Sequence, residues 1–162
     1  MTEQKEPKLL KRRVLGRKDV KNLKKNAGDL LKSVNTNAVS QATVIDGSTV
    51  YIFTREILLA KKNGILFPTL TNPVIESLPA IIVDMGAIPF VCNGADVMRP
   101  GITKINGDFN KNGLVIIKDE KHHKVLGVGL ALLPSSDMKE QKKGKAVLNL
   151  HYVGDKIWNS IT

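Results

Sequence analysis

Residues 82–102 read IVDMGAIPFVCNGADVMRPGI and contain the most informative motifs in the second half of the chain. Gly94 and Gly101 stand on either side of a run in which we predict a short helix, Ala95–Met98. Pro100 lacks an amide hydrogen and ends that helix, so a strand is expected to follow it. Because glycine has no side chain, both glycines let a ligand come close to the backbone.

On both sides of this stretch the sequence has short runs of Val, Ile and Leu, separated by Gly, Asn, Asp and Ser. We predict strands at 80–84, 86–91, 113–118, 124–133 and 145–153. Several short strands at this spacing favour a small closed or nearly closed barrel. Gly127 and Gly129 lie inside one of these strands and predict a bulge or a sharp bend. We expect exposed turns at His122-His123 and at the basic run Lys139–Lys145.

The first half of the chain mixes helical and extended patterns. An apolar stripe with a period of 3.6 residues predicts an amphipathic helix over Lys18–Leu31. Asp46-Gly47-Ser48 lies between two runs rich in β-branched residues, so it predicts a hairpin of 38–45 and 49–53. Residues 65–71 return to an extended pattern.

A second helix is predicted from Arg55 to Lys62. The Thr54 hydroxyl would cap its first turn, and Asn63-Gly64 would end it, because Gly accepts the left-handed conformation. Pro73 and Pro79 then mark a domain boundary. We therefore expect an α+β N-terminal module, residues 1–76, followed by a mainly-β domain, residues 79–158.

The charge of the chain is strongly positive. Lys and Arg outnumber Asp and Glu by 25 to 15, which gives a net charge of +10 and an isoelectric point near 9.8. The excess is concentrated in residues 1–32, which hold eleven basic and four acidic residues. This balance favours a polyanionic partner such as nucleic acid, and the alternative is a solvated surface that aids solubility.

The sequence carries little catalytic or metal-binding chemistry. The single Cys92 excludes an intramolecular disulfide, and the three histidines lack the spacing of zinc ligands. Walker A and G-x-S-x-G motifs are absent from the sequence. No apolar run is long enough for a membrane span, and the N-terminus does not read as a secretory signal. We expect a cytoplasmic protein that is not an enzyme and holds no cofactor or metal.

Four motifs together resemble the PUA domain, an RNA-binding module named after pseudouridine synthases and archaeosine transglycosylases. They are Asp84 with Gly86-Ala87, the run Gly94–Ile102, the strand Gly127–Ala131, and Gly144-Lys145-Ala146. The ending HYVGDKIW, His151–Trp158, is similar to a narrower group. With the basic leader and the preceding module, it resembles the malignant T-cell amplified sequence family and its archaeal single-chain relatives. The resemblance implies a PUA pseudo-barrel after the N-terminal module.

The resemblance also implies an RNA-binding groove along the turn and the last strand. The start of the predicted helix would offer backbone N–H groups to a phosphate. Arg99 can stack on a base or bind a phosphate, and Val97 and Met98 would divide between them the filling of the barrel and an apolar surface for a base. The glycines and Pro100 would also be needed simply to form the turn. The predicted RNA-binding residues are Gly94, Ala95, Asp96, Val97, Met98, Arg99, Pro100, Gly101, Lys104, Lys145, His151 and Tyr152.

Three further residues of the domain have predicted roles. Lys118 is a candidate phosphate contact, like Lys104 and Lys145. Trp158 is expected to pack in the barrel core or cover its open end, and Cys92 is expected to be a small buried residue.

The resemblance implies a non-catalytic RNA-binding protein of translation that recognises the small ribosomal subunit, tRNA or rRNA. Two alternatives stay open. The first is a protein–protein adaptor, in which residues 1–75 dock a translation factor. The second is an accessory subunit of an RNA-modification enzyme, because PUA domains often accompany catalytic domains.

Overall fold

The computed structural model describes residues 9–161 and divides into two compact units. Of the described residues, unit 1 contains 9–72 and 156–161, and unit 2 contains Pro73–Asp155. Residues 1–8 of the expected N-terminal module, and residue 162, lie outside the described residues. The division falls slightly before the boundary drawn from the sequence, and the C-terminal residues return to unit 1.

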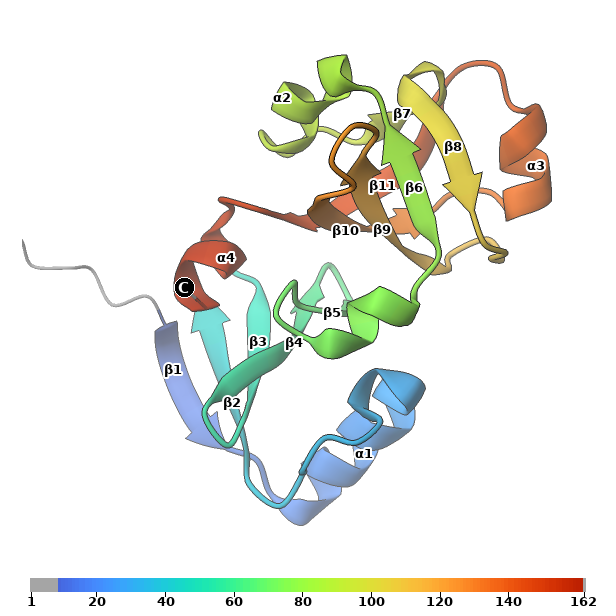
Figure 1. Cartoon of the computed structure of the whole chain (residues 1–162). Helices are drawn as coiled ribbons and strands as arrows, with labels where there is room; N and C mark the ends of the chain where they lie inside the picture. Colours follow the sequence, from blue (N-terminus) through green and yellow to red (C-terminus); the bar gives the residue numbers. More distant parts are fainter. Residues whose placement is uncertain (1–8, 162) are drawn as a thin grey trace, which may run out of the picture. The chain divides into compact units, whose positions relative to one another are not determined.

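Unit 1 is built on a five-stranded antiparallel sheet in which each strand pairs with the next one along the chain (Figure 1). Its strands are β1 (Leu9–Val14), β2 (Val39–Val44), β3 (Thr49–Phe53), β4 (Glu56–Lys62) and β5 (Ile65–Pro68). The hairpin of β2 and β3 confirms the prediction from Asp46-Gly47-Ser48.

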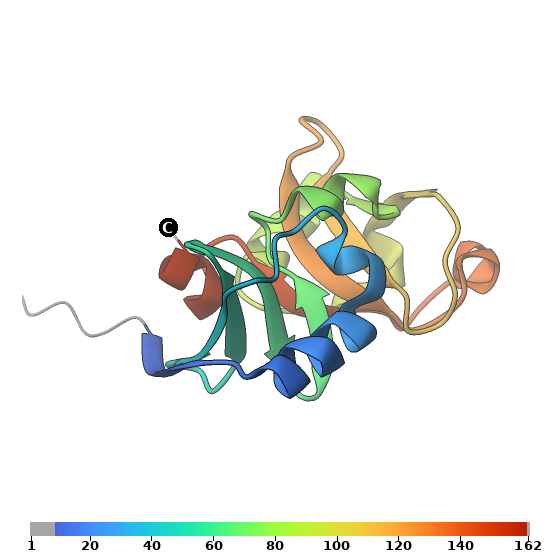
Figure 2. The same ribbon diagram turned by 90° about the horizontal axis from the view of Figure 1, so that it is seen from below.

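A helix, α1 (Arg17–Ala27), packs on this sheet and continues as a 3₁₀ turn, Gly28–Leu31 (Figures 1 and 2). Its buried stripe, Leu23, Ala27 and Leu31, joins apolar residues of the sheet in one core. This confirms the predicted amphipathic helix. The short C-terminal helix α4 (Lys156–Ile161) contacts β2 and β4, so Trp158 belongs to unit 1.

The helix predicted over Arg55–Lys62 is wrong, because this segment is strand β4. Asn63 and Gly64 have φ values of 50° and 77° and form a two-residue hairpin turn to β5. A helix end and such a turn both require the left-handed conformation, so the same two residues fit either structure. The run Ile57–Ala60 is buried on both faces, as expected for a strand inside a covered sheet.

Unit 2 is a six-stranded sheet of order β7-β11-β10-β9-β6-β8, with β6 and β9 parallel and the other neighbours antiparallel. The strands are β6 (Ala80–Val83), β7 (Val97–Met98), β8 (Ile102–Asn106), β9 (Leu114–Asp119), β10 (Val125–Ala131) and β11 (Lys145–Tyr152). Two helices, α2 (Ile88–Val91) and α3 (Ser135–Glu140), and three 3₁₀ turns, Pro73–Ser77, Met85–Ala87 and Arg99–Gly101, join them. The second half is therefore mainly β, as predicted.

Two predicted elements of unit 2 are wrong. The segment 86–91 is not a strand but the 3₁₀ turn Met85–Ala87 followed by α2. The Asp84 carboxylate starts it by accepting a hydrogen bond from the Ala87 amide at 2.8 Å. The predicted helix Ala95–Met98 is replaced by β7, because Val97 and Met98 pair with β11. Part of the expected turn at Lys139–Lys145 is also helical, since α3 runs to Glu140.

The two strand glycines of β10 lie at irregularities in the sheet, as predicted. The pairing register shifts between Val125 and Gly127 against β9, and between Val128 and Gly129 against β11. A Cβ atom at Gly127 would lie 2.5 Å from the carbonyl oxygen of His151. Glycine is therefore required here for the close approach of β10 and β11.

Among residues 9–161, none of the helices is both long and apolar enough to cross a membrane.

Candidate functional site

Unit 2 contains an apolar hollow of about 310 Å³ between the segment 84–91 and the segment 95–101. Its walls carry two large apolar side chains that are exposed, Phe90 at 67% and Met98 at 47%. Val91 and Val97 close the floor, and both belong to the unit 2 core. An exposed apolar surface of this kind is suited to a flat apolar partner rather than to an ion.

Gly101 lines the hollow and Gly94 directly precedes the lining residue Ala95, and the two positions require glycine to different degrees. A Cβ atom at Gly101 would lie 3.5 Å from the Ala87 Cβ, which is ordinary contact, so Gly101 leaves open space that a side chain could occupy. Gly94 has a φ of 93°, and a Cβ atom there would lie 3.2 Å from the Tyr152 hydroxyl oxygen. Gly94 is therefore needed for the turn itself, with Tyr152 lying against it.

The chain from Val91 to Asp96 is fastened to β11 by Asn149. The Asn149 side-chain amide donates hydrogen bonds to the carbonyl oxygens of Val91 and Ala95, at 3.0 and 3.1 Å. Its backbone N–H donates to the Asp96 carboxylate at 2.9 Å. The other carboxylate oxygen of Asp96 lies 3.2 Å from Lys145 Nζ. Asp96 and Ala95 thus shape the wall of the hollow, with Asp96 engaged by β11.

Arg99 is also engaged by the protein. Its Nε donates to the Met138 carbonyl oxygen at 2.8 Å, and a terminal nitrogen donates to the Ile102 carbonyl oxygen at 3.1 Å. Its backbone N–H donates to the Gly144 carbonyl oxygen at 2.8 Å. Arg99 therefore holds the 3₁₀ turn that Pro100 helps form against the basic segment, residues 139–145.

The basic segment carries Lys139, Lys142, Lys143 and Lys145 and a single acidic residue, Glu140. These four lysines are all exposed. Lys145 pairs with Met98 across β11 and β7, so positive charge borders the hollow directly. Lys104 and Lys118 lie on either side of Ile82 in neighbouring strands, and both align with it in register. They form a second basic group on the sheet.

His151 is fully buried. Its Nδ1 lies 2.9 Å from an Asp155 carboxylate oxygen, which also accepts a hydrogen bond from the Tyr152 backbone N–H. We therefore leave His151 out of the proposed interface and assign it to the end of β11. Tyr152 itself is half-buried.

The sequence reasoning missed Phe90. Residues 86–91 were expected to form a strand, in which alternate side chains would be buried. Asp84 followed by Pro89 could have indicated a helix start, because Asp is a favoured N-cap residue and Pro suits the first helical turn. A short helix at this place turns Phe90 outward.

Other titratable groups lie in turns. The Asp119 carboxylate accepts hydrogen bonds from the backbone N–H groups of His122, Lys124 and Lys121, and these bonds hold its pKa below the usual value. His122 and His123 are exposed in this β9–β10 turn, as predicted. Burial raises the pKa of the Cys92 thiol, which is half-buried. Within residues 9–161, no three His, Cys, Asp or Glu side chains gather in a way that could hold a metal ion.

Comparisons with known proteins agree with this architecture. The PUA domain family model matches residues 79–153. An uncharacterized protein of Methanocaldococcus jannaschii is 40% identical over 156 residues, covering 92% of this chain and 96% of that protein. A hypothetical protein of Pyrococcus horikoshii has a similar crystal structure, with a TM-score of 0.76, 26% identity, and coverage of 94% of this chain and 100% of that chain.

Two relatives carry descriptive names. Translation machinery-associated protein 20 of Saccharomyces cerevisiae is 31% identical over 122 residues, which covers 70% of this chain and 67% of that protein. Malignant T-cell-amplified sequence 1-B of Xenopus laevis is 29% identical over 142 residues, which covers 83% of this chain and 73% of that protein.

Proposed function

This chain belongs to the family of translation machinery-associated protein 20 and the malignant T-cell-amplified sequence proteins, and on that premise we propose that it is a non-catalytic RNA-binding protein of translation. The observation that carries the proposal is the apolar hollow of unit 2, with Phe90 and Met98 exposed beside the basic segment 139–145.

The two surfaces suit the two parts of an unpaired nucleotide. A base can pack on the exposed side chains of Phe90 and Met98, since every base has an apolar face. Lys142, Lys143 and Lys145 can attract the adjoining phosphates, in a way that weakens as salt increases. Proteins that recognise RNA in this way take single-stranded ends, loops or bulges. Candidate targets are therefore the end of a tRNA or an exposed rRNA segment of the small ribosomal subunit.

The carboxylates at the hollow support a role without catalysis. Asp84 accepts a hydrogen bond from the Ala87 backbone N–H, and Asp96 accepts one from the Asn149 backbone N–H and pairs with Lys145. Both groups therefore hold the backbone in shape and are poorly placed to take or give a proton during a reaction.

Fluorescence anisotropy tests the proposal. The labelled probes are a CCA-ended RNA stem and an intact tRNA, and unlabelled small ribosomal subunits compete with them across a salt series. The double variant Phe90→Ala/Met98→Ala should weaken binding by about tenfold or more, since stacking on an aromatic group contributes roughly 1–3 kcal/mol per base. The matched control is Ile45→Ala, which removes an exposed apolar side chain from unit 1.

If the double variant binds RNA with unchanged affinity, the hollow is not part of the RNA-binding surface. In that case, binding of a translation factor that survives nuclease treatment would favour the adaptor alternative.

A further inference from the structure

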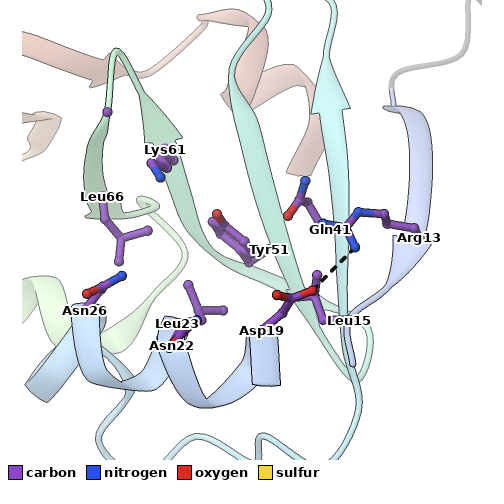
Figure 3. A pocket seen from close by; sticks show the side chains of 11 residues that line it. Arg13, Leu15, Asp19, Asn22, Leu23, Asn26, Gln41, Tyr51, Lys61 and Leu66 are labelled. Carbon is purple, nitrogen blue, oxygen red and sulfur yellow. Dashed lines mark ion pairs between the residues drawn. The ribbon is translucent and has the colours of Figure 1, made fainter. Parts of the chain in front are cut away.

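Unit 1 contains a separate cavity of about 450 Å³ between α1 and the sheet. Figure 3 shows its lining side chains, which come from β1 to β5 on one side and from α1 on the other. In contrast to the hollow of unit 2, most of these side chains are polar. A volume of this size is within the range of small-ligand sites.

The sheet contributes a row of aligned residues. Arg13 of β1 pairs with Gln41 of β2, and Gln41 pairs with Tyr51 of β3. Directly paired residues project their side chains to the same face of a sheet, so this row faces the cavity together. Lys61 of β4 and Leu66 of β5 form a second aligned pair that extends the cavity.

The helix contributes Asp19, Asn22, Leu23 and Asn26. Their spacing of three, four and seven residues places them on one side of α1. Leu23 is buried and anchors the helix in the core of unit 1. Asp19, Asn22 and Asn26 border this anchor and line the same cavity, as Figure 3 shows.

These polar groups are largely unused by the protein. Within residues 9–161, the side chains of Asn22, Asn26, Gln41, Tyr51 and Lys61 make no hydrogen bond or ion pair with one another or with other groups. Arg13 is only loosely paired, with 3.7 Å between its terminal nitrogen and an Asp19 carboxylate oxygen. Asn22, Asn26 and Lys61 are exposed, so their polar groups are open to solvent and available to a ligand.

The Tyr51 hydroxyl is a hydrogen-bond donor at neutral pH. Burial raises its pKa above the ordinary value, and the nearby positive charge of Arg13 lowers it by less. Tyr51 is 8% exposed as a residue and packs in the core of unit 1. Tyr51 therefore offers a fixed hydroxyl group at the sheet side of the cavity.

The chemistry of the cavity indicates its ligand. Three carboxamide side chains and a hydroxyl can read the donor and acceptor groups on the edge of a planar base. Leu15, Leu23 and Leu66 supply apolar surface for the ring. Arg13 and Lys61 outweigh Asp19 in charge, so an anionic group is favoured at the rim. A bare anion would leave the three carboxamides unused, and an uncharged sugar would leave the two cations unused.

We propose that the cavity between α1 and the sheet of unit 1 binds one unpaired nucleotide, with its base among the carboxamides and its phosphate at Arg13 and Lys61. The proposal rests on the proposed RNA-binding function, because RNA would be the source of that nucleotide. It gives the protein a second RNA contact, separate from the hollow of unit 2. A free mononucleotide has the same chemistry and is the other source to be tested.

Amide NMR spectra of the full chain, titrated with AMP, CMP, GMP or UMP, test the proposal directly. At least one nucleotide should shift the signals of α1 and β3, whereas inorganic phosphate and the matching nucleoside should bind more weakly. Tyr51→Phe keeps the ring and removes the hydroxyl, and it should weaken binding by about three- to tenfold, as expected for one hydrogen bond.

Two neighbouring lysines supply a matched pair of charge variants. Lys61→Gln should weaken nucleotide binding by about tenfold, because it removes a charged contact to phosphate. Lys62→Gln removes the same charge from the next residue of β4, whose side chain points to the opposite face, and should leave binding unchanged. Equal effects of the two variants, or binding of phosphate as tight as that of every nucleotide, would overturn the nucleotide site. So would the absence of any shift with all four nucleotides.

A single-stranded oligonucleotide distinguishes the source of the nucleotide and separates this proposal from the first one. If RNA supplies it, Lys61→Gln and Phe90→Ala/Met98→Ala should each weaken oligonucleotide binding, and only Lys61→Gln should weaken mononucleotide binding. The Phe90/Met98 variant could leave oligonucleotide affinity unchanged while Lys61→Gln weakens binding of both the oligonucleotide and the mononucleotide. That result would support the nucleotide site in the cavity and contradict RNA binding at the hollow. If Lys61→Gln weakens only mononucleotide binding, the ligand is a free nucleotide and the RNA source is overturned.

Discussion

The polar side chains around the hollow of unit 2 are hydrogen-bonded to the protein, whereas, within the part of the chain that the structure describes, most of those in the cavity of unit 1 are not. Around the hollow, Asp84, Asp96, Arg99 and Asn149 all bond to the protein backbone, and the exposed surface that remains is apolar. In the cavity, Gln41 and Lys61 are among the polar side chains that have no partner within the described part of the chain, residues 9–161. The first arrangement suits stacking, which tolerates any base, and the second suits reading of a base edge.

Mutations of polar residues should therefore have different effects on stability and on binding at the two places. A polar residue beside the hollow is expected to affect stability first and binding second. A polar residue in the cavity is expected to affect binding with little change in stability.

Gly127→Ala should have the largest effect. The new methyl group would lie 2.5 Å from the His151 carbonyl oxygen, so the β10–β11 pairing must shift. We expect the free energy of unfolding to fall by about 2–3 kcal/mol, as in other overpacked interiors, when measured by urea unfolding. Gly16→Ala is the control, since a Cβ at Gly16 would have no atom within 4 Å outside its two neighbours in the chain. Equal stability of the two variants would contradict the close strand approach.

Arg99→Met should lower the free energy of unfolding by about 1–3 kcal/mol, because two backbone carbonyl oxygens lose a charged donor. The change is measured by urea unfolding, with the exposed Arg17→Met as control. RNA affinity should fall mainly through the altered turn, so its dependence on salt should keep nearly the same slope. A clearly shallower slope with unchanged stability would instead make Arg99 a phosphate contact.

Alanine substitutions at Gly94 and Gly101 should differ in their effects, the first mainly on stability and the second mainly on RNA binding. Gly94→Ala should destabilise the protein by about 1–2 kcal/mol, since its φ of 93° strains any other residue. Gly101→Ala should leave stability within about 0.5 kcal/mol and weaken RNA binding severalfold, because its methyl group enters the hollow. Urea unfolding and fluorescence anisotropy measure the two effects. If Gly101→Ala binds RNA normally, the hollow is not the base site.

Asp119→Ala should change how stability depends on acidic pH, with the difference between the two proteins shrinking as the pH falls. Its pKa is lowered in the folded protein, chiefly by the hydrogen bond from the His122 backbone N–H. A carboxylate with a lowered pKa stabilises the fold above the unfolded-state value of about 3.9, and this contribution is lost as the pH falls through the lowered value. Asp119→Ala should therefore show a flatter dependence of unfolding free energy on pH below about 4. An identical dependence in both proteins would contradict the three backbone hydrogen bonds.

Much of the architecture followed from local patterns. The period of the apolar residues identified α1, and Asp46-Gly47-Ser48 identified the β2–β3 hairpin. The motifs between Asp84 and Ile102, together with the ending His151–Trp158, led to the PUA family. These features depend on residues that are close in sequence, so the sequence by itself determined them.

Other features depended on residues that are distant in sequence. Asn63-Gly64 fits either a helix end or a hairpin, and the pairing of β4 with both β3 and β5 decided in favour of the hairpin. The sequence alone suggests that Arg99 binds a phosphate. In the structure, its Nε instead donates a hydrogen bond to the carbonyl oxygen of Met138, which is distant in sequence. The cavity of unit 1 likewise exists only because sheet register aligns Arg13, Gln41 and Tyr51 beside α1. Tertiary structure decided these points, because pairing register and burial determine which polar groups already have partners and which remain available to a ligand.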